Sequence, residues 1–289
     1  MAAATVVAAL ALLAAACTGS PHPPQVSPAA NAQATPNATA KATPKASAAA
    51  PRVTITPGNG AAGADPSAGI TVTATRGTLT HVTVRTSGDA VPGQLSQGNT
   101  VWRSQWALDV SQAYTVTATA TAPRHGGTVT ATSSFRTLTP SRTFRTYTPL
   151  GYRATYGVGM PIILYFSQRI TDKAAVERAL QITTSNPVVG AWYWDDPCNM
   201  APTCAYFRPR DYWPAGTTVS FTGHLNGVRG APGVYGYHTL TQTFSIGPSL
   251  IAIGNTATHR TQIYYNGKLL YNWPISSGRP GDETPTGAT

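Results

Sequence analysis

Residues 114–119 read Tyr-Thr-Val-Thr-Ala-Thr, and this alternation of apolar residues with threonine decides the fold of the region around it. Successive side chains of a β-strand point to opposite faces of a sheet, so the pattern predicts a strand with one buried face. The same period recurs at 53–56, 70–75, 80–85, 101–106 and 129–135, and Gly, Pro, Asn and Asp separate the runs. These short strands predict an Ig-like β-sandwich over residues 51–140.

A second unit of the same kind is predicted for residues 141–247. One helix is expected over 172–182, because Thr171 can cap its first turn and Val176 and Leu180 share a helical face. Its expected strands are 153–158, 161–166, 188–194, 205–208, 217–222 and 241–246. The chain is therefore expected to be all-β, with two tandem Ig-like sandwiches.

Two tryptophans in the first unit, Trp102 and Trp106, are an even number of positions apart. Residues at even spacing share one face of a strand, and we expect that face to be the core. An exposed pair that stacks on carbohydrate is the alternative.

The N-terminus has the pattern of an exported protein. Residues 5–16 form an apolar run of signal-peptide length, too short to span a bilayer as a helix. Ala16-Cys17, followed by Thr-Gly-Ser, resembles a bacterial lipobox, so residues 1–17 are predicted to be a signal peptide and Cys17 the lipidation site. An ordinary secretory signal with an incidental Cys17 is the alternative. Residues 18–50, rich in Pro, Ala and Thr, are expected to form an extended tether.

Cys198 and Cys204 enclose a short Pro-containing loop. In an exported chain a disulfide between them is the default. A metal site would need further ligands, and none of the six histidines stands in a zinc-type spacing with these cysteines. A catalytic thiol is disfavoured because no histidine neighbours either cysteine in sequence, although a partner brought close by folding stays open.

The charge of the chain argues against nucleic-acid binding. The net charge is +10, but the excess of Lys and Arg is spread over every segment and forms no stripe or recognised motif. Such a diffuse charge favours contact with anionic polymers of the cell envelope, or serves solubility alone.

Residues 248–289 are predicted to begin a further β-domain. Asn266-Gly267 between two apolar-rich runs is a strong signal for a type I′ hairpin. Two or three strands cannot bury enough apolar surface to be stable alone. We therefore expect this segment to be the N-terminal fragment of a larger domain.

Several motifs of the second unit resemble the Ig-like domain that precedes the catalytic domain of actinobacterial L,D-transpeptidases. They lie at 156–161, 173–180, 190–194, 208–217 and 243–247. Together with the first sandwich and the tail, which resembles the start of the catalytic domain, the likeness covers residues 51–289. It implies a supporting role for the two sandwiches, as spacers that position a catalytic domain.

The resemblance also implies an activity, peptidoglycan cross-linking by a cysteine acyltransferase. A Cys thiolate activated by His attacks the carbonyl after the third residue of a tetrapeptide stem and releases D-alanine, and the amine of a neighbouring stem's third residue resolves the thioester. The family places this nucleophile in a Ser-His-Gly-Cys-x-Asn motif, which does not occur in these 289 residues. No catalytic residue, cofactor or metal is therefore assigned, and this chain is expected to be inactive.

The resemblance predicts peptidoglycan stem peptides as partners, with the membrane reached through the lipid anchor. The expected location is the outer face of the cytoplasmic membrane, extending into the cell wall. The alternative is a non-catalytic, lipid-anchored Ig-like protein that binds wall polymer or an envelope partner. A general Ig-like adhesin or carbohydrate-binding module rests on fold analogy alone.

Overall fold

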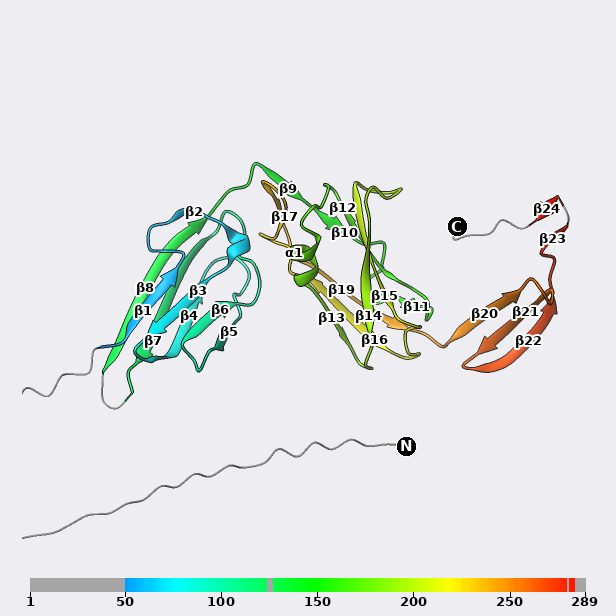
Figure 1. Ribbon diagram of the computed structural model, residues 1–289, viewed down its shortest axis with the longest axis horizontal. Coiled ribbons are helices and arrows are strands. Elements are labelled where there is room, and N and C mark those ends of the chain that lie inside the picture. The colour runs from blue at the N-terminus through cyan, green and yellow to red at the C-terminus, as the bar shows by residue number, and fades with distance from the viewer. Residues whose placement is uncertain (1–49, 124–126, 280, 284–289) are drawn as a thin grey trace, which may run out of the picture. The chain divides into compact units, whose positions relative to one another are not determined.

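The computed structural model of the protein describes residues 50–123, 127–279 and 281–283 (Figure 1). The predicted signal peptide, its lipobox with Cys17 and the tether up to residue 49 lie outside the described residues.

Two four-stranded sheets make up the first sandwich, as the alternating sequence predicted. One sheet has the order β1-β3-β6-β5 and the other the order β2-β8-β7-β4. The strands of the first are β1 (Arg52–Thr56), β3 (Thr71–Thr75), β6 (Val101–Ser104) and β5 (Gly93–Ser96). Those of the second are β2 (Ala62–Ala64), β8 (Thr128–Thr137), β7 (Ala113–Thr121) and β4 (Thr78–Arg85), and a short 3₁₀ turn, η1 (Pro66–Ala68), follows β2.

Strand β7 shows how the period-2 sequence becomes structure. Tyr114 and Val116 are buried in the core with the other even-numbered residues of the strand. The odd-numbered threonines face outward and pair with hydroxyl groups of β8 at 3.0–3.3 Å, namely Thr115 with Ser134, Thr117 with Thr132, Thr119 with Thr130 and Thr121 with Thr128. The alternation thus provides a packed inner face and a hydrogen-bonded outer face.

Two four-stranded sheets and a smaller one make up the second sandwich. Their orders are β10-β12-β15-β14, β11-β19-β16-β13 and β17-β18-β9. The first sheet contains β10 (Thr146–Tyr147), β12 (Ile162–Phe166), β15 (Thr203–Pro209) and β14 (Gly190–Asp195). The second contains β11 (Thr155–Tyr156), β19 (Leu240–Ile246), β16 (Thr218–Gly223) and β13 (Leu180–Thr184). The third contains β17 (Arg229–Ala231), β18 (Val234–Gly236) and β9 (Arg142–Phe144).

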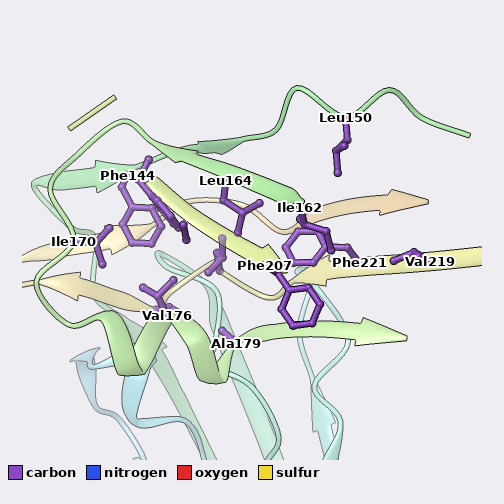
Figure 2. Packing of buried hydrophobic residues seen from close by; sticks show 14 of the residues in the cluster. Phe144, Leu150, Ile162, Leu164, Ile170, Val176, Ala179, Phe207, Val219 and Phe221 are labelled. Carbon is purple, nitrogen blue, oxygen red and sulfur yellow. The ribbon is translucent and has the colours of Figure 1, made fainter. Parts of the chain in front are cut away.

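Helix α1 (Lys173–Arg178) is shorter than the sequence predicted. Its cap is Asp172, whose Oδ1 accepts a hydrogen bond from the N–H of Ala175 at 3.1 Å, and not Thr171. Residues from Leu180 onward form β13, because they pair with β16 in the sheet. Figure 2 shows Val176 of α1 directed into the same apolar cluster as Phe144 and Ile170, so the helix covers the core without extending further.

The prediction that Trp102 and Trp106 share a core-facing side is half wrong. Trp102 is buried in the first core. Strand β6 ends at Ser104, so the even spacing no longer fixes the direction of Trp106. Its ring instead stacks on His224 of the second sandwich, with 4.1 Å between ring centroids and 10° between planes.

The segment after the second sandwich forms a three-stranded sheet, β20-β21-β22. Its strands are β20 (Leu250–Asn255), β21 (Arg260–Tyr265) and β22 (Lys268–Pro274), and a small ladder of β23 (Gly278–Arg279) and β24 (Asp282–Glu283) follows. Asn266 and Gly267 have φ of 46° and 77°, as a type I′ turn requires. The hairpin prediction is confirmed.

Candidate functional site

The cysteine loop is a closed connection between β14 and β15. The sulfurs of Cys198 and Cys204 are joined, with 5.9 Å between the Cα atoms. Beside the loop, the Arg169 guanidinium lies 3.1 Å from the Asp196 carboxylate. A sulfur in this bond carries no thiolate, so the loop as it stands offers no nucleophile.

The tryptophan next to this loop is held by packing contacts. Trp194 stacks on Phe166 with 5.5 Å between ring centroids, and its indole N–H donates to the Glu177 carboxylate of α1. The Lys173 ammonium lies 5.7 Å from the Trp194 ring centroid, within cation–π range. These contacts hold the Trp194 ring against the sandwich and α1.

The first two sandwiches touch around the Trp106–His224 stack. The Val110 N–H donates to the Asn226 side-chain oxygen at 3.3 Å. A Cβ on Gly227, which has φ of 74°, would lie 1.7 Å from the carbonyl oxygen of Leu108, so this approach requires glycine. Burial lowers the pKa of His224, and the negative charge of Asp89 opposes that change. The contact combines stacking, a hydrogen bond and close backbone approach.

The sheet β20-β21-β22 differs from both sandwiches because it exposes large apolar side chains on both of its faces. Leu250 and Ile253 are three positions apart in the regularly paired strand β20, so they point to opposite faces, yet they are 63% and 52% exposed. Trp273 is also 51% exposed, and its ring stacks only on that of Tyr271, at 4.5 Å. Apolar side chains exposed on both faces are typical of a surface that makes contacts with another protein surface or ligand.

A row of tyrosines on the second sandwich was missed by the sequence analysis. Tyr147 lies directly opposite Tyr165 in the β10–β12 pair, and Tyr193 opposite Tyr206 in the β14–β15 pair. All four point away from the core. Tyr165, Tyr193 and Tyr206 lay in predicted strands and Tyr147 did not, and only the strand order places the four residues side by side.

Neither a metal cluster nor a spanning helix is found in the described part of the chain. Across residues 50–123, 127–279 and 281–283, no three His, Cys, Asp or Glu side chains come together as a metal site would need. The helices in those ranges are too short or too polar to cross a membrane.

L,D-transpeptidases are among the known proteins that this chain resembles. L,D-transpeptidase 5 of Mycobacterium tuberculosis is 32% identical over 230 residues, which cover 79% of this chain and 51% of that protein. L,D-transpeptidase 2 of the same species is 32% identical over 237 residues, covering 82% and 56%. The solved structure of LD transpeptidase LdtMt1 in complex with imipenem is 29% identical, covers 51% of this chain and 59% of that one, and has a TM-score of 0.40.

This chain spans about half the length of the curated relatives it matches. The family model for the bacterial Ig domain matches residues 61–229, more than half of the chain and parts of both sandwiches. The chain therefore belongs to the bacterial Ig domain family and is homologous to L,D-transpeptidases.

Proposed function

We propose that this chain is the supporting part of an envelope protein of the L,D-transpeptidase family, which cross-links peptidoglycan. The observation that carries the proposal is the sheet β20-β21-β22, whose two faces expose apolar side chains such as Leu250 and Ile253. Such a sheet begins a domain and does not complete one. It follows the second sandwich, and the relatives are L,D-transpeptidases about twice as long as the matched region.

In this proposal residues 51–140 and 141–247 are Ig-like spacers, and residues 248–289 begin the catalytic domain. The chain is exported, held at the outer face of the membrane by a lipid on Cys17, and reaches the wall through the tether at 18–50. The contacts around Trp106 and His224 limit movement between the spacers. The substrates are peptidoglycan stem peptides.

The chemistry is acyl transfer through a Cys thioester that joins third residues of neighbouring stems. The three cysteines of this chain do not carry it. Cys198 and Cys204 are joined to each other, and Cys17 is the proposed lipidation site. We therefore propose that these 289 residues alone are inactive, and that the nucleophile belongs to the longer product.

The test compares the 289-residue chain with the longest in-frame product of its gene. Both are incubated with imipenem, the ligand of the related LdtMt1 structure, and analysed by intact mass. We expect one covalent adduct on the longer product, together with release of D-alanine from tetrapeptide stems, and none on the 289-residue chain. An adduct on Cys198 or Cys204 would overturn the disulfide assignment, and no activity in the longer product would overturn the function.

A further inference from the structure

The outward face of the sheet β10-β12-β15-β14 carries four tyrosine rings in one row. Tyr147 and Tyr165 stack with 5.1 Å between ring centroids and 30° between planes. Tyr193 and Tyr206 lie 6.2 Å apart with 37° between planes. Adjacent strands are separated by about 4.8 Å, so a row across four strands is on the order of 15 Å long.

The two ring pairs are continuous across the sheet. Tyr206 is opposite Ile163, two residues before Tyr165 in the same strand, so Tyr165 and Tyr206 are diagonal neighbours. Partial burial raises the pKa of the Tyr206 phenol, and the Asp195 carboxylate and the neighbouring phenols Tyr165 and Tyr193 raise it further. The strand register and the ring distances place the four rings close together on one surface.

The row is open to solvent and ends in a hollow. Tyr193 is 66% exposed and Tyr147 is 47% exposed. Beside Tyr147 lies an open hollow of about 450 Å³, which is also lined by Arg145 and Tyr237. The Arg145 guanidinium lies 5.7 Å from the centroid of the Tyr237 ring, so a cation is held at this end of the aromatic row.

The chemistry of this face differs from that of the sheet β20-β21-β22. There the exposed side chains include leucines; here each ring of the row carries a hydroxyl group. Tyrosine combines an apolar ring face with a polar tip and suits a surface where one end is apolar and the other wet. Pyranose sugars have the matching character, with C–H groups on their ring faces and hydroxyls at their edges.

We propose that the row Tyr147, Tyr165, Tyr206 and Tyr193 is a binding track for a glycan strand of peptidoglycan. Sugar rings stack on the phenol rings. Where a stem peptide has been cleaved from the strand, the freed lactyl carboxylate of an amino sugar meets the Arg145 guanidinium in the hollow. An elongated row favours a linear polymer, and the arginine at its end complements that carboxylate. The inference rests on the proposed location in the wall, but not on acyl transfer.

Binding is measured with the full 289-residue chain. The probes are insoluble peptidoglycan, used in co-sedimentation, and soluble glycan strands freed of stem peptides by an amidase, used in calorimetry. We expect Tyr193→Ala and Tyr147→Ala each to weaken glycan binding about tenfold, and the double variant about a hundredfold if the two rings act independently. Tyr193→Phe retains the ring and is expected to bind within about twofold of the parent chain.

Tyr152→Ala is the matched control, because Tyr152 is 67% exposed and lies outside the row. Circular dichroism and the intact mass of the disulfide form verify that each variant is folded. Arg145→Gln is expected to weaken binding to amidase-treated strands, whose lactyl carboxylates are free, more than binding to strands in which that group is reduced to an alcohol.

Three outcomes would overturn the track. One is equal binding of the glycan by the parent chain and the Tyr147, Tyr193 double variant. Another is binding of free stem peptides but not of stripped glycan, which would place recognition elsewhere. A third is binding that high salt abolishes equally in every variant, which would indicate non-specific attraction to the basic chain. None of these outcomes depends on the imipenem adduct, so the track and the proposed catalysis fail separately.

Discussion

Replacing Tyr114 by Phe tests the packing of the first sandwich most directly. The N–H of Asp109 donates to the Tyr114 hydroxyl at 2.8 Å, and the tyrosine is only 2% exposed. The Phe variant keeps the ring that stacks on Phe135 but removes the acceptor. A buried N–H without a partner costs about 1–3 kcal/mol, so the free energy of unfolding at pH 7 is expected to fall by that amount.

The same variant changes the pH dependence of stability. Burial, with the Asp109 charge adding to it, raises the pKa of Tyr114 from 10.0 to about 12. The unfolded phenol loses its proton near pH 10 while the folded one keeps it. The contribution of Tyr114 to the free energy of unfolding is therefore fully present below pH 10 and is lost as the pH rises towards 12. The total loss is on the order of 2–3 kcal/mol, and Tyr114→Phe is expected to remove it.

Fluorine NMR of 5-fluorotryptophan-labelled protein measures the first sandwich separately, because Trp102 lies in its core. The Trp102 signal, assigned with Trp102→Phe, is followed through urea unfolding at pH 8 and pH 11. Tyr152→Phe, at a phenol 67% exposed, is the control and should change neither value. Two results would refute the reasoning. One is equal destabilisation by Tyr114→Phe and Tyr152→Phe, and the other is a loss of stability between pH 8 and pH 11 that is as large in Tyr114→Phe as in the parent chain.

Three further predictions concern the second sandwich. Intact mass before and after reduction should differ by two hydrogen atoms, and exchanging Cys198 and Cys204 together for Ser should lower the free energy of unfolding in urea by about 2 kcal/mol, given the short loop. Two free thiols in the oxidised protein would contradict this. Asp172→Ala removes the cap of α1 and should lower the free energy of unfolding by about 1 kcal/mol, whereas Asp172→Asn should retain most of the capping stabilisation. Burial lowers the pKa of His224, so below pH 6.5 the unfolded state takes up the proton more readily than the folded state. The contribution of His224 to the free energy of unfolding should therefore be fully present above pH 6.5 and decline as the pH falls below it. Unfolding is followed by the fluorine signal of Trp106. His224→Gln should make the decline in stability with falling pH shallower, and an unchanged pH dependence would exclude His224 as the source of that decline.

Local patterns predicted those parts of the fold that depend on local rules. The alternation around Tyr114 required one buried face whatever its partner strands, and Asn266-Gly267 required positive φ at both turn positions. The helix was predicted too long because the apolar spacing of Val176 and Leu180 fits a helix, while pairing with β16 draws Leu180 into a strand. Short apolar runs allow both readings, and tertiary pairing decides between them.

The candidate sites depended on relations that the sequence does not display. Trp106 left the strand pattern two residues after β6 ended, and its partner His224 is more than a hundred positions away. The tyrosine row needs the order β10-β12-β15-β14, in which β12 lies beside β15 although other strands separate them in the chain. The resemblance to L,D-transpeptidases predicted the family context but carried no information about this face.

The outer face of β7 and β8 is stabilised by pairs of neutral hydroxyl groups, from Thr115 with Ser134 to Thr121 with Thr128. The three ion pairs within the described ranges all lie beyond residue 168, outside this first sandwich. Dissolved ions screen charges but not neutral hydrogen bonds. In the proposed envelope location, the first sandwich should therefore keep its stability when the ionic strength around it rises or falls.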